Sequence, residues 1–253
     1  MKNDELEIDK IYDKTAKKYR DERSSKGTIH NTYIANPAIR TMLQDVRDKR
    51  LLDIGCGYGE DLKYFYNLGA EVIGIELNGE LINLAKQDPE LKDVEIFQGS
   101  IYSLNFKKSF DICLANLVLD QVKDLDQALR EVNKVLKNGG IFVFSVAHPL
   151  NCATNNYQEQ LSDYFTTRKG YFHPTSMTCS IPYYYRNFED YSKTFFNAGF
   201  FIKKIVEPKP LPEAKTIFLE KFERFSKLPD ILIFELIKYK SFNNGSDNLH
   251  PGD

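Results

Sequence analysis

Three glycines at alternating positions in LLDIGCGYGED, residues 51–61, could bring the main chain close to a bound molecule. Gly55, Gly57 and Gly59 follow an apolar run and precede a segment that can form a helix. Glycine has no Cβ, so a glycine turn at a helix amino terminus can place N–H groups against a ligand. A dinucleotide site reads G-x-G-x-x-G, and the spacing G-x-G-x-G therefore predicts a site for another ligand.

Polar residues end several of the following apolar runs and could complete such a site. Glu76 ends VIGIE, and His148 comes directly after IFVFSVA. Ligands of open α/β sheets bind at the carboxyl ends of the strands, where both residues are expected. A neutral imidazole there could take a proton from a hydroxyl or an amine. The alternative for His148 is a structural ring that fixes the turn into Pro149.

The elements that must position these residues alternate between apolar runs and helix-period segments. We expect strands at 51–55, 71–76, 94–99, 110–116, 140–147, 200–206 and 231–237. Helices are expected at 60–68, 80–87, 125–137 and 188–198. The pattern predicts an α/β fold with a Rossmann-like, seven-stranded, mostly parallel sheet and helices on both faces. The last two strands are expected to pair as a hairpin at the sheet edge.

The helix over 125–137 has the strongest signals, with a cap at Asp124 and an end at Asn138-Gly139. After Pro149 periodicity stops for about forty residues, and aromatic and polar residues dominate up to Arg186. Such a stretch is typical of a lid or binding segment, although its tyrosines could also form a satellite core. Arg186 could bind an acidic acceptor group, and pairing with Glu189 or Asp190 is the favoured alternative.

Composition disfavours several classes of function. Lys and Arg total 34 against 36 for Asp and Glu, which disfavours a nucleic-acid substrate. No apolar run is long enough to cross a membrane, and the amino terminus is polar, so we expect a cytoplasmic protein. The cysteines form no CxxC pair, which favours reduced thiols over disulfides or a metal site. The tail 241–253 is expected to be disordered.

The ordered set of motifs resembles the class I S-adenosylmethionine-dependent methyltransferases. The matching segments are LLDIGCGYGED, VIGIELN, QGSI, FDICLAN and LKNGGIFVFSVAHP, with YDKTAKKY upstream. A small-molecule subgroup is also similar at SVAHP, PYYYR and AGFFIKKIVEP, although Tyr185 stands where that subgroup tends to have His. The resemblance implies residues 1–40 as a helical cap, 41–148 and 187–240 as the core, and 149–186 as a substrate lid.

The resemblance also implies a cofactor, S-adenosylmethionine with S-adenosylhomocysteine as product, and a set of contacts. Glu76 would accept bonds from the ribose hydroxyls, and Ser100 stands where the family usually has an Asp against the adenine amine. The implied cofactor residues are Tyr12, Tyr19, Asp53, Gly55, Cys56, Gly57, Glu76, Leu77, Ser100, Ile101 and Asn116. The implied catalytic residues are His148, Tyr19 and Tyr185.

The expected partner is a small-molecule acceptor with an oxygen, nitrogen or carbon nucleophile, and the chain is expected to be a monomer or a homodimer. Because a sulfonium already activates its methyl group, the protein would mainly align the acceptor and exclude water. Two other classes stay open. A nicotinamide-dependent oxidoreductase would share the glycine turn, and a non-catalytic nucleotide-binding regulator would share everything up to His148.

Overall fold

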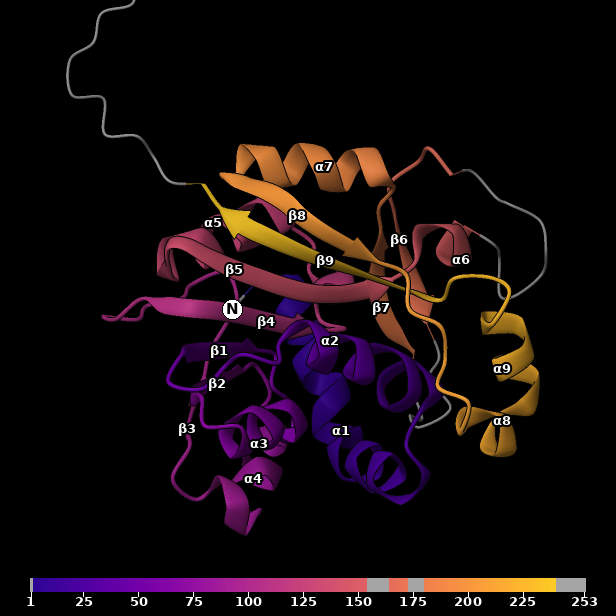
Figure 1. Ribbon diagram of the computed structural model, residues 1–253, viewed down its shortest axis with the longest axis horizontal. Coiled ribbons are helices and arrows are strands. Elements are labelled where there is room, and N and C mark those ends of the chain that lie inside the picture. The colour runs from indigo at the N-terminus through magenta and orange to yellow at the C-terminus, as the bar shows by residue number, and fades with distance from the viewer. Residues whose placement is uncertain (1, 154–163, 173–179, 240–253) are drawn as a thin grey trace, which may run out of the picture.

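The computed structural model describes residues 2–153, 164–172 and 180–239 (Figure 1). Seven strands form one sheet in the order β3-β2-β1-β4-β5-β9-β8. The first five strands of this order run parallel, and β9 is antiparallel to both of its neighbours. These strands are β1 (Arg50–Ile54), β2 (Glu71–Glu76), β3 (Glu95–Gln98), β4 (Phe110–Asn116), β5 (Leu136–Ala147), β8 (Phe200–Val206) and β9 (Ile231–Lys238). The predicted Rossmann-like sheet is thereby confirmed.

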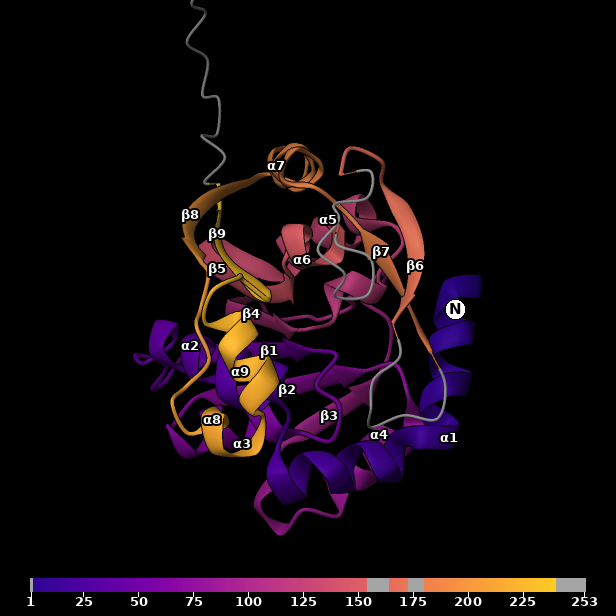
Figure 2. The ribbon, with the colours of Figure 1, turned by 90° about the vertical axis from the view of Figure 1, so that its right-hand side faces the viewer.

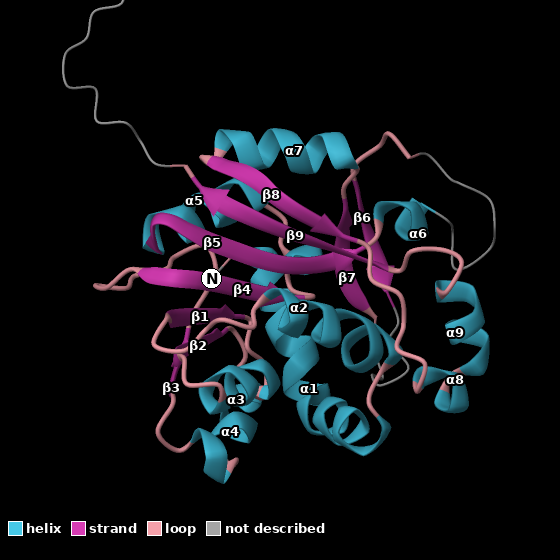
Figure 3. Cartoon of the chain, viewed as in Figure 1, coloured by secondary structure: helices cyan, strands magenta, loops and turns pink. Residues whose placement is uncertain are grey.

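Helices lie on both faces of this sheet (Figure 3). The α-helices are α1 (Asn3–Lys26), α2 (Asn36–Met42), α3 (Glu60–Asn67), α4 (Gly79–Lys86), α5 (Leu125–Val135), α6 (Pro149–Ala153), α7 (Phe188–Asn197), α8 (Ala214–Ile217) and α9 (Leu219–Phe225). Successive side chains of a strand point to opposite faces, so Leu52 packs with the core of α5 and α7 and Leu51 with that of α2 and α3. Strands buried on both faces explain the continuous apolar runs of the sequence.

The helix α5 ends earlier than its sequence pattern predicts. Asp124 caps it as expected, with the carboxylate accepting the Gln127 N–H at 3.0 Å. The chain then becomes extended at Leu136, which pairs with Phe110 as the first residue of β5, so the predicted end at Asn138-Gly139 is wrong. The Lys238 ammonium satisfies the carbonyls of Asn133 and Leu136, at 2.6 and 2.8 Å. A side chain distant in sequence thus stabilises the earlier helix end.

The segment after β5 contains regular structure that the sequence pattern did not predict. A hairpin forms from β6 (Arg168–Phe172) and β7 (Ile181–Tyr185), which pair antiparallel. Figure 2 shows this hairpin standing beside the amino-terminal half of α1, apart from the main sheet. Because β7 reads IPYYY, apolar and aromatic side chains lie on both of its faces and no polar alternation marks it as a strand.

The edge hairpin forms as the sequence predicts. The strands β8 and β9 pair at the edge of the sheet, joined through α8 and α9. Cys56 and Cys113 are free and buried. No helix within the described ranges is long and apolar enough to span a membrane. The tail 241–253 lies outside the described residues.

Candidate functional site

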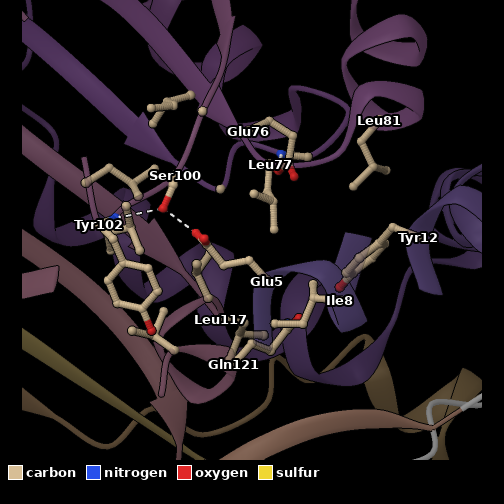
Figure 4. Close-up of a pocket in the computed structure, with 18 of the residues that line it drawn as sticks. Glu5, Ile8, Tyr12, Glu76, Leu77, Leu81, Ser100, Tyr102, Leu117 and Gln121 are labelled. Carbon is tan, nitrogen blue, oxygen red and sulfur yellow. Dashed lines mark hydrogen bonds between the residues drawn. The ribbon is translucent and has the colours of Figure 1, made fainter. Parts of the chain in front are cut away.

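A cavity opens at the carboxyl ends of β1, β2 and β4, and α1 forms its other wall (Figure 4). Of the sequence-predicted site residues, nine line it: Tyr12, Tyr19, Gly55, Gly57, Glu76, Leu77, Ser100, Ile101 and Asn116. Four do not: Asp53, Cys56, His148 and Tyr185. The topology therefore gathers segments from five parts of the chain at the end of the sheet where ligands of such folds bind.

The glycine turn presents main chain to this cavity. Gly55 and Gly57 have φ values of 70° and 58°, in the left-handed region that favours glycine. The Gly55 and Cys56 N–H groups donate to the Ile75 carbonyl at 2.7 and 3.2 Å, which anchors the turn to β2. A Cβ built on Gly57 would meet no atom within 4 Å, so the open side of the turn faces free space. A ligand can therefore approach the backbone at Gly57.

Glu76 is held rigidly at the end of β2. Its side chain is buried, and its two carboxylate oxygens accept the N–H groups of Gly57 and Asn78, each at 2.9 Å. Burial raises the pKa of Glu76, against the lowering effect of the two N–H groups. A carboxylate has about four lone-pair positions, so this one keeps acceptor capacity for ligand hydroxyls.

Asp53 and Cys56 lie beneath the turn, away from the cavity. Burial raises the pKa of Asp53 well above its usual value, and Asp61 and Glu76 add to this effect by repulsion. The Cys56 sulfur would lie 2.8 Å from a Cβ on Gly74, so it packs against β2. Burial likewise raises the pKa of the Cys56 thiol. These two residues therefore support the turn, and neither is among the residues that line the cavity.

Two tyrosines of α1 face the cavity. The Tyr12 and Tyr19 rings are 5.8 Å apart in an edge-to-face arrangement, and Tyr19 contacts Tyr58 in the same way at 6.1 Å. Arg23 donates to the Tyr19 hydroxyl at 2.9 Å and pairs with Glu60 at 2.8 Å. Burial raises the pKa of Tyr12, so its hydroxyl stays protonated at neutral pH. Such a group can donate a hydrogen bond but cannot take a proton.

His148 is fully buried and does not reach the cavity. Its Nδ1 accepts the Leu150 N–H at 3.2 Å, so Nε2 carries the proton and donates to Glu207 at 2.8 Å. The ring also contacts Phe188 edge-to-face at 5.7 Å. Burial lowers the pKa of His148, against the effect of Glu207. Both ring nitrogens are thus occupied in shaping the turn after β5, which is the structural alternative raised above.

Tyr185 and Arg186 are also occupied away from the cavity. The Tyr185 hydroxyl donates to the Tyr164 carbonyl at 2.9 Å. The buried Arg186 guanidinium donates to the carbonyls of Leu119, Val122, Lys123 and Tyr184. The favoured pairing of Arg186 with Glu189 or Asp190 is therefore wrong. This guanidinium instead joins β7 to the chain that follows β4, because it donates to carbonyls on both segments.

Several cavity residues were not predicted from the sequence. Asp4, Glu5 and Ile8 line the wall that α1 contributes, and Tyr102 and Gln121 line the opposite wall. Asp120 lies beside Gln121 in the short helix η3 (Leu119–Gln121) and accepts the Ala147 N–H at 2.9 Å. Acidic residues in a first helical turn are common, so the sequence carried no signal that Asp4 and Glu5 face a ligand site.

The cavity combines a buried carboxylate at Glu76 with apolar side chains at Leu77 and Ile101. All ionisable side chains that line the cavity are acids or tyrosines within the described parts of the chain. An anionic ligand is therefore disfavoured, whereas a ligand with hydrogen-bond donors or positive charge is favoured.

Comparison with known proteins agrees with this geometry. Residues 52–144 match the methyltransferase domain family. Curated relatives include an uncharacterized protein of Methanocaldococcus jannaschii, 35% identical over 57% of this chain and 53% of that protein. The ubiquinone biosynthesis O-methyltransferase of Pelagibacter ubique is 33% identical over 45% of this chain and 48% of that enzyme. The chain thus spans about half the length of these curated relatives.

Solved structures give fuller coverage. A protein from Listeria monocytogenes, to which S-adenosylmethionine-dependent methyltransferase activity has been assigned, is 26% identical to this chain. The two superpose with a TM-score of 0.69 over 81% of this chain and 97% of the other. An S-adenosylmethionine-dependent methyltransferase from Mesorhizobium loti shares the fold, with 24% identity and a TM-score of 0.68 over 80% of this chain and 96% of its own. The glycine turn, the strand order and these matches together show a methyltransferase domain over residues 52–144 in the fold of the S-adenosylmethionine-dependent methyltransferases.

Proposed function

We propose that this protein transfers the methyl group of S-adenosylmethionine to a small-molecule acceptor. The observation that carries the proposal is the cavity in which the open side of Gly57 and the buried carboxylate of Glu76 face the same space. In this proposal Glu76 accepts hydrogen bonds from the ribose hydroxyls, and the turn at Gly55 and Gly57 passes the amino-acid part. Leu77 and Ile101 flank the base.

The cofactor supplies an activated methyl group and a neutral leaving group when bound. The chain would therefore mainly align the acceptor and exclude water. We assign water exclusion to α1 as a cap and to the hairpin β6–β7 as part of a lid. Supporting this role, Lys169 on β6 pairs with Glu7 of α1 at 2.7 Å, so the two covers contact each other. The remainder of the proposed lid, 154–163 and 173–179, lies outside the described residues.

The acceptor class follows from charge and from the relatives. An oxygen acceptor is named for the ubiquinone biosynthesis O-methyltransferase, whereas the fatty-acid O-methyltransferase of Mycolicibacterium smegmatis is named for a carboxylic acid. The acidic lining disfavours a carboxylate acceptor, because like charges repel in a partly buried site. We therefore propose a neutral hydroxyl or an amine as the methylated group.

Such an acceptor loses a proton, and we propose that Asp120 receives it; Asp120 does not itself line the cavity but adjoins the lining residue Gln121. One carboxylate oxygen accepts the Ala147 N–H, and no bond of the other oxygen is found among the described residues. Burial raises the pKa of Asp120 to about 7, against the effect of that N–H. A base with a pKa near the working pH is the most effective proton acceptor. This assignment replaces the predicted bases His148 and Tyr185, whose polar atoms are engaged elsewhere.

Calorimetric titration with S-adenosylhomocysteine and with NAD tests the proposal, followed by a methyl-transfer screen over phenols, alcohols, amines and carboxylic acids. We expect binding of S-adenosylhomocysteine alone and turnover of a hydroxyl or amine compound. Binding of NAD in its place would support an oxidoreductase. Binding of S-adenosylhomocysteine without any turnover across the screen would favour the non-catalytic regulator. Light scattering of the same sample decides between a monomer and a homodimer, the two states that we expect from the sequence.

A further inference from the structure

Glu5 is a nearly buried carboxylate that faces the cavity from the first turn of α1. It is 6% exposed, and one of its oxygens accepts the Lys2 N–H at 2.7 Å. The other oxygen accepts the Ser100 hydroxyl, as the dashed line in Figure 4 shows. Glu5 therefore reaches across the cavity to the polar end of the wall formed by Ser100, Ile101 and Tyr102.

The charge of Glu5 is not balanced by a neighbouring cation. The Lys2 ammonium pairs with Asp124 at 3.3 Å, and no ion pair of Glu5 occurs within the described part of the chain. Asp4, the adjacent acid, also lines the cavity and accepts the Tyr102 hydroxyl at 3.1 Å. Buried carboxylates are usually paired or fully hydrogen-bonded, so this pair of acids has capacity for further donors. A ligand in the cavity that they face can supply such donors.

The surroundings define what kind of donor fits. The walls next to Glu5 are apolar, with Ile8 on α1 and Leu77 and Ile101 on the sheet side, so they favour an apolar ring. An ionised carboxylate only accepts hydrogen bonds. It therefore favours a ring that carries an amino group at this edge over the same ring with a carbonyl.

We propose that Glu5 recognises the exocyclic amino group of the cofactor's adenine, so that α1 supplies part of the cofactor's specificity. The inference rests on the proposed function, because it assigns the base to the Ser100 end of the cavity and the ribose to Glu76. Ser100 is the weaker candidate, because its hydroxyl proton is given to Glu5 and its oxygen already accepts the Tyr102 N–H at 3.0 Å, which leaves one lone pair against two on the Glu5 carboxylate.

The alternative is that Glu5 only caps α1. It occupies the third position of the helix, and its bond to the Lys2 N–H is half of a capping box. Glutamine keeps the carbonyl oxygen for that bond and can donate from its amide nitrogen. Glu5→Gln thus preserves the cap while it changes what the cavity offers to the ring.

The experiment compares S-adenosylhomocysteine with S-inosylhomocysteine, in which a carbonyl replaces the amino group, by calorimetric titration. We expect the wild-type protein to prefer the adenosyl ligand roughly 10- to 100-fold, the effect of one charge-assisted hydrogen bond. Glu5→Gln and Glu5→Ala should reduce that preference to within a few-fold. Glu7→Gln is the matched control, because Glu7 lies on the same helix but bonds to Lys169 and Tyr171 outside the cavity, and it should retain the preference.

Amide hydrogen exchange of α1 in each variant separates recognition from capping. A preserved preference in Glu5→Gln and Glu5→Ala would overturn the inference. An equal loss of affinity for both ligands, together with faster exchange of α1 in Glu5→Gln, would also overturn it, because Glu5 would then be only a cap. No binding of either ligand by the wild-type protein would contradict the proposed function itself. Failure of the Glu5 inference is distinguishable from failure of the proposed function, because the wild-type protein is titrated before the variants are compared.

Discussion

Replacing His148 tests whether its ring shapes the fold or takes part in the chemistry. His148→Ala removes the acceptor for the Leu150 N–H, the donor to Glu207 and an edge-to-face contact with Phe188. The Glu207 side chain is 54% exposed, so its bond is screened by solvent and contributes about 1 kcal/mol. The bond to the Leu150 N–H and the ring contact are each worth about 1 kcal/mol. We therefore expect a loss of about 3 kcal/mol.

In a domain of this size a loss of about 3 kcal/mol lowers the melting temperature by roughly 6 to 12 °C. His148→Asn offers a side-chain oxygen to the Leu150 N–H and should lose less. Thermal unfolding and urea titration measure the two losses, and calorimetric titration at a temperature where both variants are folded should give unchanged affinity for S-adenosylhomocysteine. Methyl transfer per folded molecule should stay within a few-fold of wild type.

The same ring also predicts a pH dependence. The pKa of His148 in the folded protein lies below the unfolded value of about 6.5. Protonation therefore favours the unfolded state, and the His148 contribution to stability falls as the pH drops below about 6.5. The stability gap between wild type and His148→Ala should narrow from pH 7 to pH 5. A variant of wild-type stability that has lost methyl transfer would refute this reasoning and return His148 to the catalytic list.

Three further outcomes follow from the site. Glu76→Ala should weaken S-adenosylhomocysteine binding at least 100-fold in calorimetry, because it removes two charge-assisted bonds of about 1.5 to 3 kcal/mol each; unchanged affinity would contradict the assignment. Gly57→Ala should stay folded, at a backbone strain of about 1 kcal/mol, yet bind S-adenosylhomocysteine at least 10-fold more weakly. Gly55→Val should instead unfold, because its Cβ would meet Val118 at 2.6 Å. The Asp120 carboxyl ionises near pH 3.8 in the unfolded chain but near 7 in the folded protein, so the wild type loses stability as the pH rises from 4 to 7. Asp120→Asn does not titrate, and its stability relative to wild type should therefore increase over that range in urea titrations. A stability difference that does not change with pH would argue against the raised pKa.

The sheet could be predicted from the sequence because each parallel strand is buried on both faces. A run such as Phe110–Asn116 has one physical explanation, and the glycines after β1 mark the turn that must follow. The hairpin β6–β7 could not be predicted, since Tyr183, Tyr184 and Tyr185 give both of its faces the same aromatic character. Pattern reasoning detects a difference between two faces and fails where none exists.

The candidate site was predictable on the sheet side and much less so on the side of α1. Gly57 and Glu76 are fixed by strand ends, whose position follows from the order of the motifs. Glu5 reaches Ser100 across 95 positions of the chain, and no local pattern encodes that meeting. His148 shows the opposite failure: its place at a strand end is right, but the ring turns to Glu207 and Leu150, and side-chain direction at a turn depends on tertiary partners.

The way α1 is attached bears on how the site works. Its buried apolar side chains are Ile8 and Ala16, whereas α5 of half its length buries five apolar residues. Polar contacts do most of the docking, among them Asn78 with Asp9 and Asp13 at 2.8 Å each. Such contacts contribute little net free energy because water replaces them when the helix departs. A ligand that contacts both α1 and the sheet therefore adds its binding free energy to a weakly held element, and the cover is most stable when the cavity is filled.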